Sequence, residues 1–304
     1  MAFSVHPLLW VPFSLAGSAA QIFRNSAQAS LTQRIGTLGA TQVRFVYGLP
    51  FAVIFILVAL AVTGSPFPHF DAQALAWTVF GALCQIGATA LMLVVMGQRA
   101  FGVAYAYIKT EPVVVALFGV VLLGDRLPPS AWLAVMIVTG GVLVASVPPR
   151  QFGQLLGETR MILFGLVSGG LFGLSAIAFR GGILALGSGG YLLRALAVLA
   201  VSLTVQTALL GIWLLARDRA AFMGSLREWR HSFGAGLAGA SASAMFMTAF
   251  GLSPAANSRT LSLIELPLAA LISHRVTGRR LKRHEWVGMS VILGGVALLL
   301  ASHS

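Results

Sequence analysis

The sequence predicts an all-α polytopic membrane protein of ten transmembrane helices, arranged as two inverted five-helix repeats. Three observations predict this fold: the composition, the long apolar runs and a likeness between the two halves of the chain. Only 9% of the 304 residues are charged and 58% are hydrophobic, with a mean hydropathy of +0.89. Soluble domains carry about 25% charged residues, so this composition argues strongly against a water-soluble enzyme.

Ten apolar stretches have the length of a bilayer-spanning helix, about 17–25 residues. Their connections are short, hold turn residues such as Pro128-Pro129 and Pro148-Pro149, and leave no room for a soluble domain. The stretches are continuously apolar and do not alternate with period two, which favours helices over a barrel. In chain order they are Leu8–Ala29, Thr41–Thr63, Ala72–Met96, Gly102–Leu123, Ala131–Val147, Met161–Ala185, Tyr191–Ala216, Phe233–Leu252, Ala255–His274 and Trp286–Ala301.

The chain repeats itself at a shift of 154 residues. Glu111 then falls on Glu265, Trp132 on Trp286, and the pair Gly140-Gly141 on Gly294-Gly295. We therefore divide the chain into a first half, residues 1–149, and a second half, residues 150–304, with five spans each. An odd number of spans inverts the second half relative to the first. Inverted repeats are a recurrent build of secondary transporters, whose solute site lies near the midplane between the repeats.

Further motifs recur in both halves. An arginine, Arg44 or Arg194, stands near the start of each second span, and each fourth span has a glutamate followed closely by Pro112 or Pro267. A Gly-Asp-Arg-Leu turn at 124–127 follows, whereas its counterpart at 278–281 reads Gly-Arg-Arg-Leu and lacks the acid. With these motifs the chain resembles the EamA family of the drug/metabolite transporter superfamily. The resemblance implies export or exchange of small metabolites, often amino acids or related compounds, by alternating access.

An ionisable side chain at the centre of a bilayer costs about 3 kcal/mol, so such residues are functional candidates. Lys109 and Glu111 are two residues apart, or about 200° on a helix, so we expect at most one of them to face a central cavity directly. The candidates for substrate binding or coupling are Lys109, Glu111, Glu265, Tyr105, Tyr107, Asn257, Arg259, Gln21, Arg24 and Asn25.

Two interpretations of the glutamates remain open. Glu111 and Glu265 either carry protons or cations and anchor a substrate ammonium, or they bond backbone groups that Pro112 and Pro267 leave free. We interpret Arg44 and Arg194 as residues that snorkel or cap neighbouring helices, and most Phe and Met residues as packing or lipid-facing.

The function predicted from these patterns is a secondary transporter of a small metabolite, with protons as a candidate coupling ion, no cofactor and no metal. The alternatives are a channel-like or non-transporting membrane subunit and, less favoured, an intramembrane enzyme. The nearest match to a serine-protease nucleophile motif, residues 239–242, reads Gly-Ala-Ser-Ala and fails at its last position. We expect a monomer or homodimer, and we attribute the net charge of +12 to membrane placement, not to nucleic-acid binding.

The basic residues are divided unequally between the loops of the two membrane sides. Thirteen Lys or Arg residues fall in the loops that follow odd-numbered spans, against three on the side that holds both termini. Because basic loops are cytoplasmic, the count predicts a plasma (inner) membrane protein with both termini outside. The EamA resemblance implies the reverse, with cytoplasmic termini.

Overall fold

The computed structural model describes residues 6–96, 107–147, 159–268, 270–271 and 281–302. Within these ranges every regular element is a helix, which confirms the all-α prediction. The helices are α1 (Trp10–Val46), α2 (Gly48–Thr63), α3 (Ala72–Met96), α5 (Glu111–Leu123), α6 (Pro129–Ser146), α7 (Thr159–Ala185), α8 (Tyr191–Arg217), α9 (Arg219–Arg227), α10 (Trp229–Leu252), α11 (Ala255–Ser262) and α13 (Arg283–Ala301).

In the described part of the chain, seven helical segments are long and apolar enough to cross a membrane. One of them, Trp10–Thr63, is 54 residues long and is interrupted at Gly36, whose φ is 73°. The Gln28 amide donates a hydrogen bond to the Ala40 carbonyl at 3.2 Å, although residues twelve apart lie about 18 Å apart along an unbroken helix. The chain therefore folds back at Gly36, where glycine tolerates the positive φ.

Two predicted spans, the fourth and the ninth, are interrupted by turns among their described residues. The apolar helix α5 has 13 residues and α11 has only 8, because turns interrupt the helical path beside each. The count of ten crossing segments thus stays a prediction.

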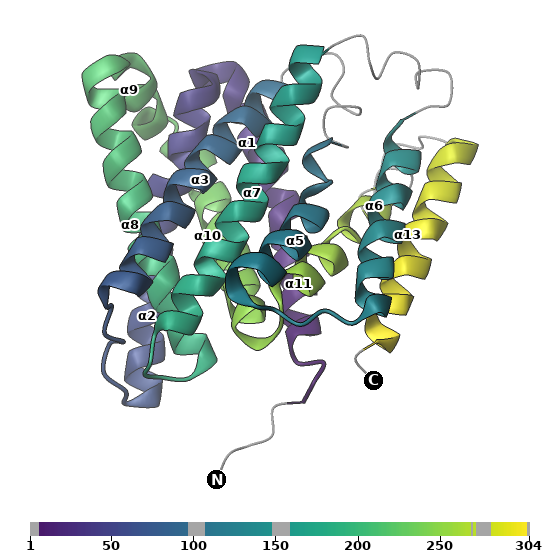
Figure 1. Ribbon diagram of the computed structural model, residues 1–304. Coiled ribbons are helices and arrows are strands. Elements are labelled where there is room, and N and C mark those ends of the chain that lie inside the picture. Colours follow the sequence, from purple (N-terminus) through teal and green to yellow (C-terminus); the bar gives the residue numbers. More distant parts are fainter. Residues whose placement is uncertain (1–5, 97–106, 148–158, 269, 272–280, 303–304) are drawn as a thin grey trace.

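The helices pack in pairs that join the two halves of the chain. Helix α3 lies along α7, α1 along α10, and α6 along α13. In Figure 1 the α6–α13 pair forms one edge of the molecule and α8 and α9 form the opposite edge, with α1, α5 and α11 between them. Helices α5 and α11 thus lie where the two halves meet.

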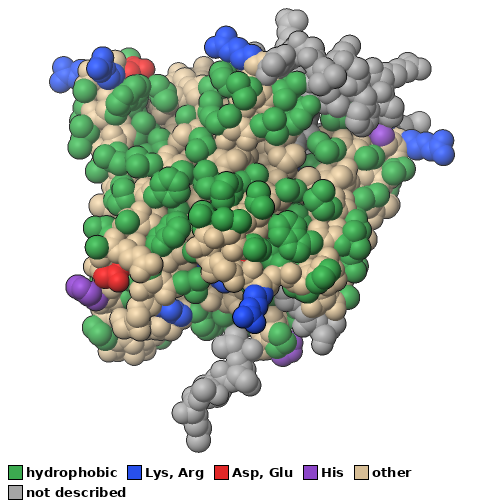
Figure 2. All heavy atoms as spheres, in the orientation of Figure 1, with side chains coloured by type: hydrophobic (Ala, Val, Ile, Leu, Met, Phe, Trp, Pro, Cys, Tyr) green, Lys and Arg blue, Asp and Glu red, His purple; other side chains and the backbone are tan. Residues whose placement is uncertain are grey.

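Apolar and polar side chains are distributed as in a membrane protein. Large apolar residues such as Leu57, Val62 and Ile212 are exposed, and hydrophobic side chains cover the middle of the molecule in Figure 2. The interior, by contrast, holds many buried polar groups, among them Gln42, Thr89 and Gln206. An apolar exterior around a polar interior suits lipid and not water. The chain is therefore a multi-pass membrane protein.

Candidate functional site

The site begins at the two interruptions beside α5 and α11. Lys109 and Thr110 form a turn directly before α5, and Leu263 and Ile264 form one after α11. Pro112 fits the first turn of α5 because proline has no N–H to leave unpaired there. Each interruption is followed at once by a glutamate, Glu111 or Glu265. Because α5 contacts α11, the two interruptions bring four charged side chains close together.

Two buried ion pairs cross between the halves at this point. Lys109 Nζ of the first half pairs with Glu265 Oε1 of the second, and Glu111 Oε1 of the first half lies 3.0 Å from Arg259 Nε of the second. The four side chains are at most 10% exposed. The Glu111–Arg259 contact is an ion pair without hydrogen-bond geometry, so it is a less specific contact than a charge-assisted hydrogen bond.

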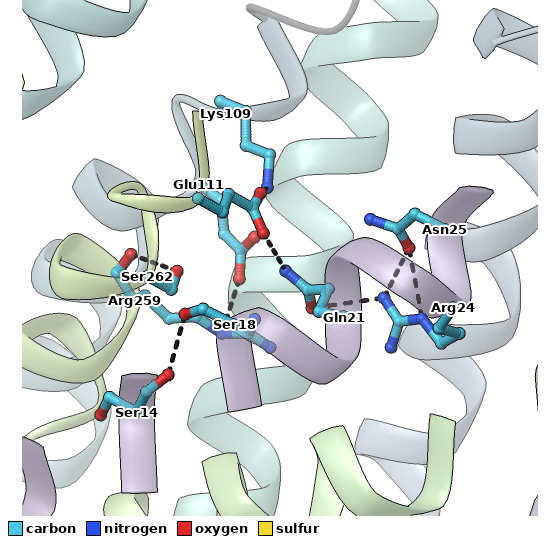
Figure 3. A network of polar contacts seen from close by, with 10 residues as sticks. Ser14, Ser18, Gln21, Arg24, Asn25, Lys109, Glu111, Arg259 and Ser262 are labelled. Carbon is cyan, nitrogen blue, oxygen red and sulfur yellow. Dashed lines mark hydrogen bonds and ion pairs between the residues drawn. The ribbon is translucent and has the colours of Figure 1, made fainter. Parts of the chain in front are cut away.

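A hydrogen-bonded chain on α1 extends this cluster, as Figure 3 shows. Gln21 Nε2 donates to Glu265 Oε2 at 3.1 Å, and Arg24 Nη2 donates to Gln21 Oε1 at 3.2 Å and to Asn25 Oδ1 at 2.8 Å. Nearby, the hydroxyls of Ser14 on α1 and Ser258 on α11 lie 2.6 Å apart. Helix α1 is thereby fixed to the second-half helix α11 and to the carboxylate that follows it.

These groups surround a cavity between the two halves. Its free space is about 30 Å³, room for one or two water molecules. The lining residues of the first half are Gln21, Arg24, Asn25, Arg44, Gln85, Met92, Ile108, Lys109 and Glu111. Those of the second half are Phe172, Phe179, Ser243, Phe246, Met247, Phe250 and Arg259.

Most of the predicted site residues meet here. Gln21, Arg24, Asn25, Lys109, Glu111 and Arg259 line the cavity, and Glu265 lies beside it through its bonds to Lys109 and Gln21. Two others are placed elsewhere. Asn257 donates to Ser253 Oγ at 2.9 Å, at the junction of α10 and α11. Tyr107 is half-buried outside the lining, and Tyr105 lies outside the described residues.

One spacing argument from the sequence is wrong. Lys109 and Glu111 both line the cavity, although an unbroken helix would point them in opposite directions. The turn at Lys109 and Thr110 removes the regular 100° advance per residue on which the argument depended.

Sequence reasoning also missed several lining residues. Arg44 does not snorkel to a membrane surface: it is 4% exposed, lines the cavity and donates to Thr89 Oγ1 at 2.8 Å. Arg194, in contrast, does act near a helix end, because its Nη1 donates to the Leu186 carbonyl just after α7. The aromatic residues carried a weak signal: Phe172 and Phe179 are seven residues apart and Phe246 and Phe250 four apart, spacings that place each pair on one helix face.

Comparisons with known proteins agree with a transporter fold. Residues 40–156 match the model of the Triose-phosphate Transporter family, which is part of the drug/metabolite transporter superfamily. The match is to that family and not to the EamA family, so the finer resemblance stays a prediction. No curated protein matches the chain.

A solved structure shares the fold over nearly the whole chain. It is described only as "Crystal structure of protein" and superposes with a TM-score of 0.66, covering 95% of this chain and 98% of that one. The sequences are 16% identical, so the likeness concerns the fold alone.

Proposed function

We propose that this protein is a secondary transporter of a small metabolite, which works by alternating access around the central cavity. The observation that carries the proposal is the pair of buried ion pairs between the halves, Lys109–Glu265 and Arg259–Glu111, at the interruptions of two helices. Such interruptions at the interface of two repeats are where transporters bind their solutes. The transporter family matched by residues 40–156 supports the same function.

The packing of the helices supports an inverted-repeat build of ten crossing segments. In this arrangement α7 is the counterpart of the part of α1 that precedes Gly36, and α10 is the counterpart of α3. The contact of α3 with α7 then becomes the counterpart of the contact of α10 with α1. The fifth segments of the two halves, α6 and α13, contact each other, as a two-fold relation requires. Two similar halves around one site can open alternately to either side by rocking.

The two ion pairs hold the halves together when no solute is bound. A buried charge without its partner is costly, so parting the halves requires a substitute for each lost contact. An anionic group of the solute among the cationic side chains of the cavity, or a proton that binds Glu111 or Glu265, offsets the charge that separation would expose. Either the solute or a proton can therefore allow the two halves to separate.

Solute counterflow in liposomes tests this function. Vesicles containing the purified protein are loaded with unlabelled phenylalanine, phenylpropionate or glycerol phosphate, and uptake of the same labelled compound is followed. We expect saturable, transient accumulation of one compound above its equilibrium level. Glu111→Gln and Glu265→Gln are expected to reduce the initial rate at least tenfold when the rate is expressed per folded protein.

The matched control is Glu228→Gln, which removes a carboxylate from the surface pair with Arg34 and leaves counterflow unchanged. Rapid, non-saturable flux that neither cavity variant alters would contradict the proposal and indicate a pore. Full counterflow by a folded Glu111→Gln/Glu265→Gln double variant would remove the two glutamates from the mechanism.

A further inference from the structure

The two halves line the cavity with different chemistry. Seven of the nine first-half lining residues are polar or charged. The second half contributes five apolar side chains among its seven lining residues, which we call the aromatic wall: Phe172, Phe179, Phe246, Met247 and Phe250. Helices α7 and α10 carry this wall, and it faces the polar segments of α1 and the turn before α5. The cavity is therefore amphipathic.

Among the described residues, the charges around the cavity do not balance. Four cationic side chains line it, Arg24, Arg44, Lys109 and Arg259, whereas the described carboxylates in and beside it are Glu111 and Glu265, an excess of two positive charges. The five other described acidic residues are engaged elsewhere: Asp71 at the start of α3, Asp125 with Arg180, Asp218 at the start of α9, Glu228 with Arg34 and Glu285 at the start of α13. Glu158 lies outside the described residues.

The side-chain stems of two of the arginines pass close to the same glycine. A side-chain carbon built on Gly239 of α10 would lie 3.3 Å from Arg24 Cδ and 3.9 Å from Arg44 Cγ. Both side chains are at most 4% exposed. Guanidinium groups gathered out of water repel one another, and an anionic group between them relieves this repulsion and accepts their hydrogen bonds.

The aromatic wall restricts what else the solute carries. The hydroxyls of a sugar need hydrogen-bond partners once they leave water, and the second-half lining offers only Ser243 and Arg259 as polar side chains among its described residues. The rings of Phe172 and Phe179 instead favour contact with an apolar group or another ring. The Arg259 guanidinium lies over the other two rings, 4.8 Å from the Phe246 centroid and 5.4 Å from the Phe250 centroid.

We propose, building on the transport function above, that the solute is an organic anion with an apolar body the size of a ring. Its anionic group binds between Arg24 and Arg44, and its body lies on the aromatic wall. The free space of about 30 Å³ is too small for this body, so the cavity must widen as the solute binds. The solute differs in this respect from a phosphorylated sugar, which matches the cationic side of the cavity but not the apolar side.

Direct binding to the purified protein in detergent tests the proposal with three compounds. Phenylpropionate has both features, phenylpropionamide keeps the ring without the charge, and glycerol phosphate keeps a charge without the ring. We expect phenylpropionate to bind at least tenfold more tightly than either of the others. Arg44→Gln and Arg24→Gln should make the affinity for phenylpropionate equal to that for phenylpropionamide. Arg44→Lys keeps the positive charge and should preserve part of the preference for the acid, which distinguishes a loss of charge from a loss of folding.

A variant of the aromatic wall separates the two features. Phe172→Leu should weaken phenylpropionate binding and leave glycerol phosphate binding unchanged, and Glu228→Gln, on the surface, should change neither. Tighter binding of glycerol phosphate, equal binding of acid and amide, or no binding of phenylpropionate would each overturn the proposal.

Binding and transport fail in different ways. If phenylpropionate binds as predicted but none of the three compounds used for counterflow accumulates, the ligand class stands and the transport function is refuted. If another compound shows counterflow while phenylpropionate does not bind, transport stands and the ligand class is refuted.

Discussion

Single residues set the electrostatics of this interior. Lys109 and Glu265 are 156 positions apart in the chain and form an ion pair inside the protein. The sequence marks both as candidates because charges within apolar spans are rare and costly. Their partners could not be predicted, because no periodicity within one helix relates residues of different halves. Arg44 shows the same limit, since only the tertiary fold distinguishes a cavity arginine from one that snorkels.

Removing one member of the buried pair should be costly. Lys109→Gln leaves the Glu265 carboxylate buried without its ammonium group, and we expect a loss of about 3–5 kcal/mol in the free energy of unfolding. The double variant Lys109→Gln/Glu265→Gln should recover most of that loss, because it removes both charges. The measurement is the midpoint of thermal unfolding in detergent, compared among Lys109→Gln, Glu265→Gln and the double variant.

The surface pair of Arg34 and Glu228 is the matched control for this prediction. The Arg34 side chain is 53% exposed, so Arg34→Gln should cost only about 0–1 kcal/mol. Equal shifts for Arg34→Gln and Lys109→Gln would show that Glu265 is solvated in the protein and not buried with its partner.

At the scale of whole helices, the apolar runs predict where helices lie better than where they break. The turns beside α5 and α11 lie within runs that hydropathy treats as continuous, and Pro112 and Pro267 are the local signals of an interruption. Because the charges sit at these turns, a regular helix model fails at the site itself. The glycine pairs are a case in which the repeat predicts a feature and the structure explains it.

One glycine of each pair permits the close contact of α6 with α13. A side-chain carbon built on Gly141 would lie 2.9 Å from the Ile292 backbone nitrogen, and one built on Gly295 would lie 2.6 Å from Val138 Cγ2. Gly140 and Gly294 have nothing within 4 Å of that position. Small residues at such contacts let helix backbones approach closely in a membrane.

Alanine substitutions should therefore separate the members of each pair. We expect Gly141→Ala and Gly295→Ala to lower the midpoint of thermal unfolding, because the added methyl group forces the helices apart. Gly140→Ala and Gly294→Ala should leave it unchanged or raise it slightly, since alanine favours a helix over glycine by about 1 kcal/mol. Similar losses at all four positions would mean that α6 and α13 do not pack through this face.

At the scale of the whole molecule, alternating access requires two halves that move around one cavity. The start of α1 and the end of α13 lie at the same end of the molecule, and α9 lies at the other (Figure 1). The repeat predicts that the two halves share one site and that Glu111 corresponds to Glu265, because a repeat preserves position along the chain. It could not predict the amphipathic cavity, because the aromatic wall belongs to the second half alone. Which end faces the cytoplasm stays a prediction of the basic loops.

Accessibility of a cavity residue from the two membrane sides tests alternating access most directly. Ser243 of α10 is half-buried and lines the cavity, whereas Ser241, two residues before it, is half-buried outside the lining. Each is replaced by cysteine in a Cys84→Ala background, because Cys84 is the single native cysteine. A membrane-impermeant thiol reagent is then applied to vesicles of both orientations.

We predict that Ser243→Cys reacts with the reagent from both sides of the membrane. The same vesicles should still hold a membrane potential, because no continuous pore is open. Ser241→Cys should react much more slowly from either side. Reaction of Ser243→Cys from one side only, or not at all, would contradict an alternately opening cavity between the two halves.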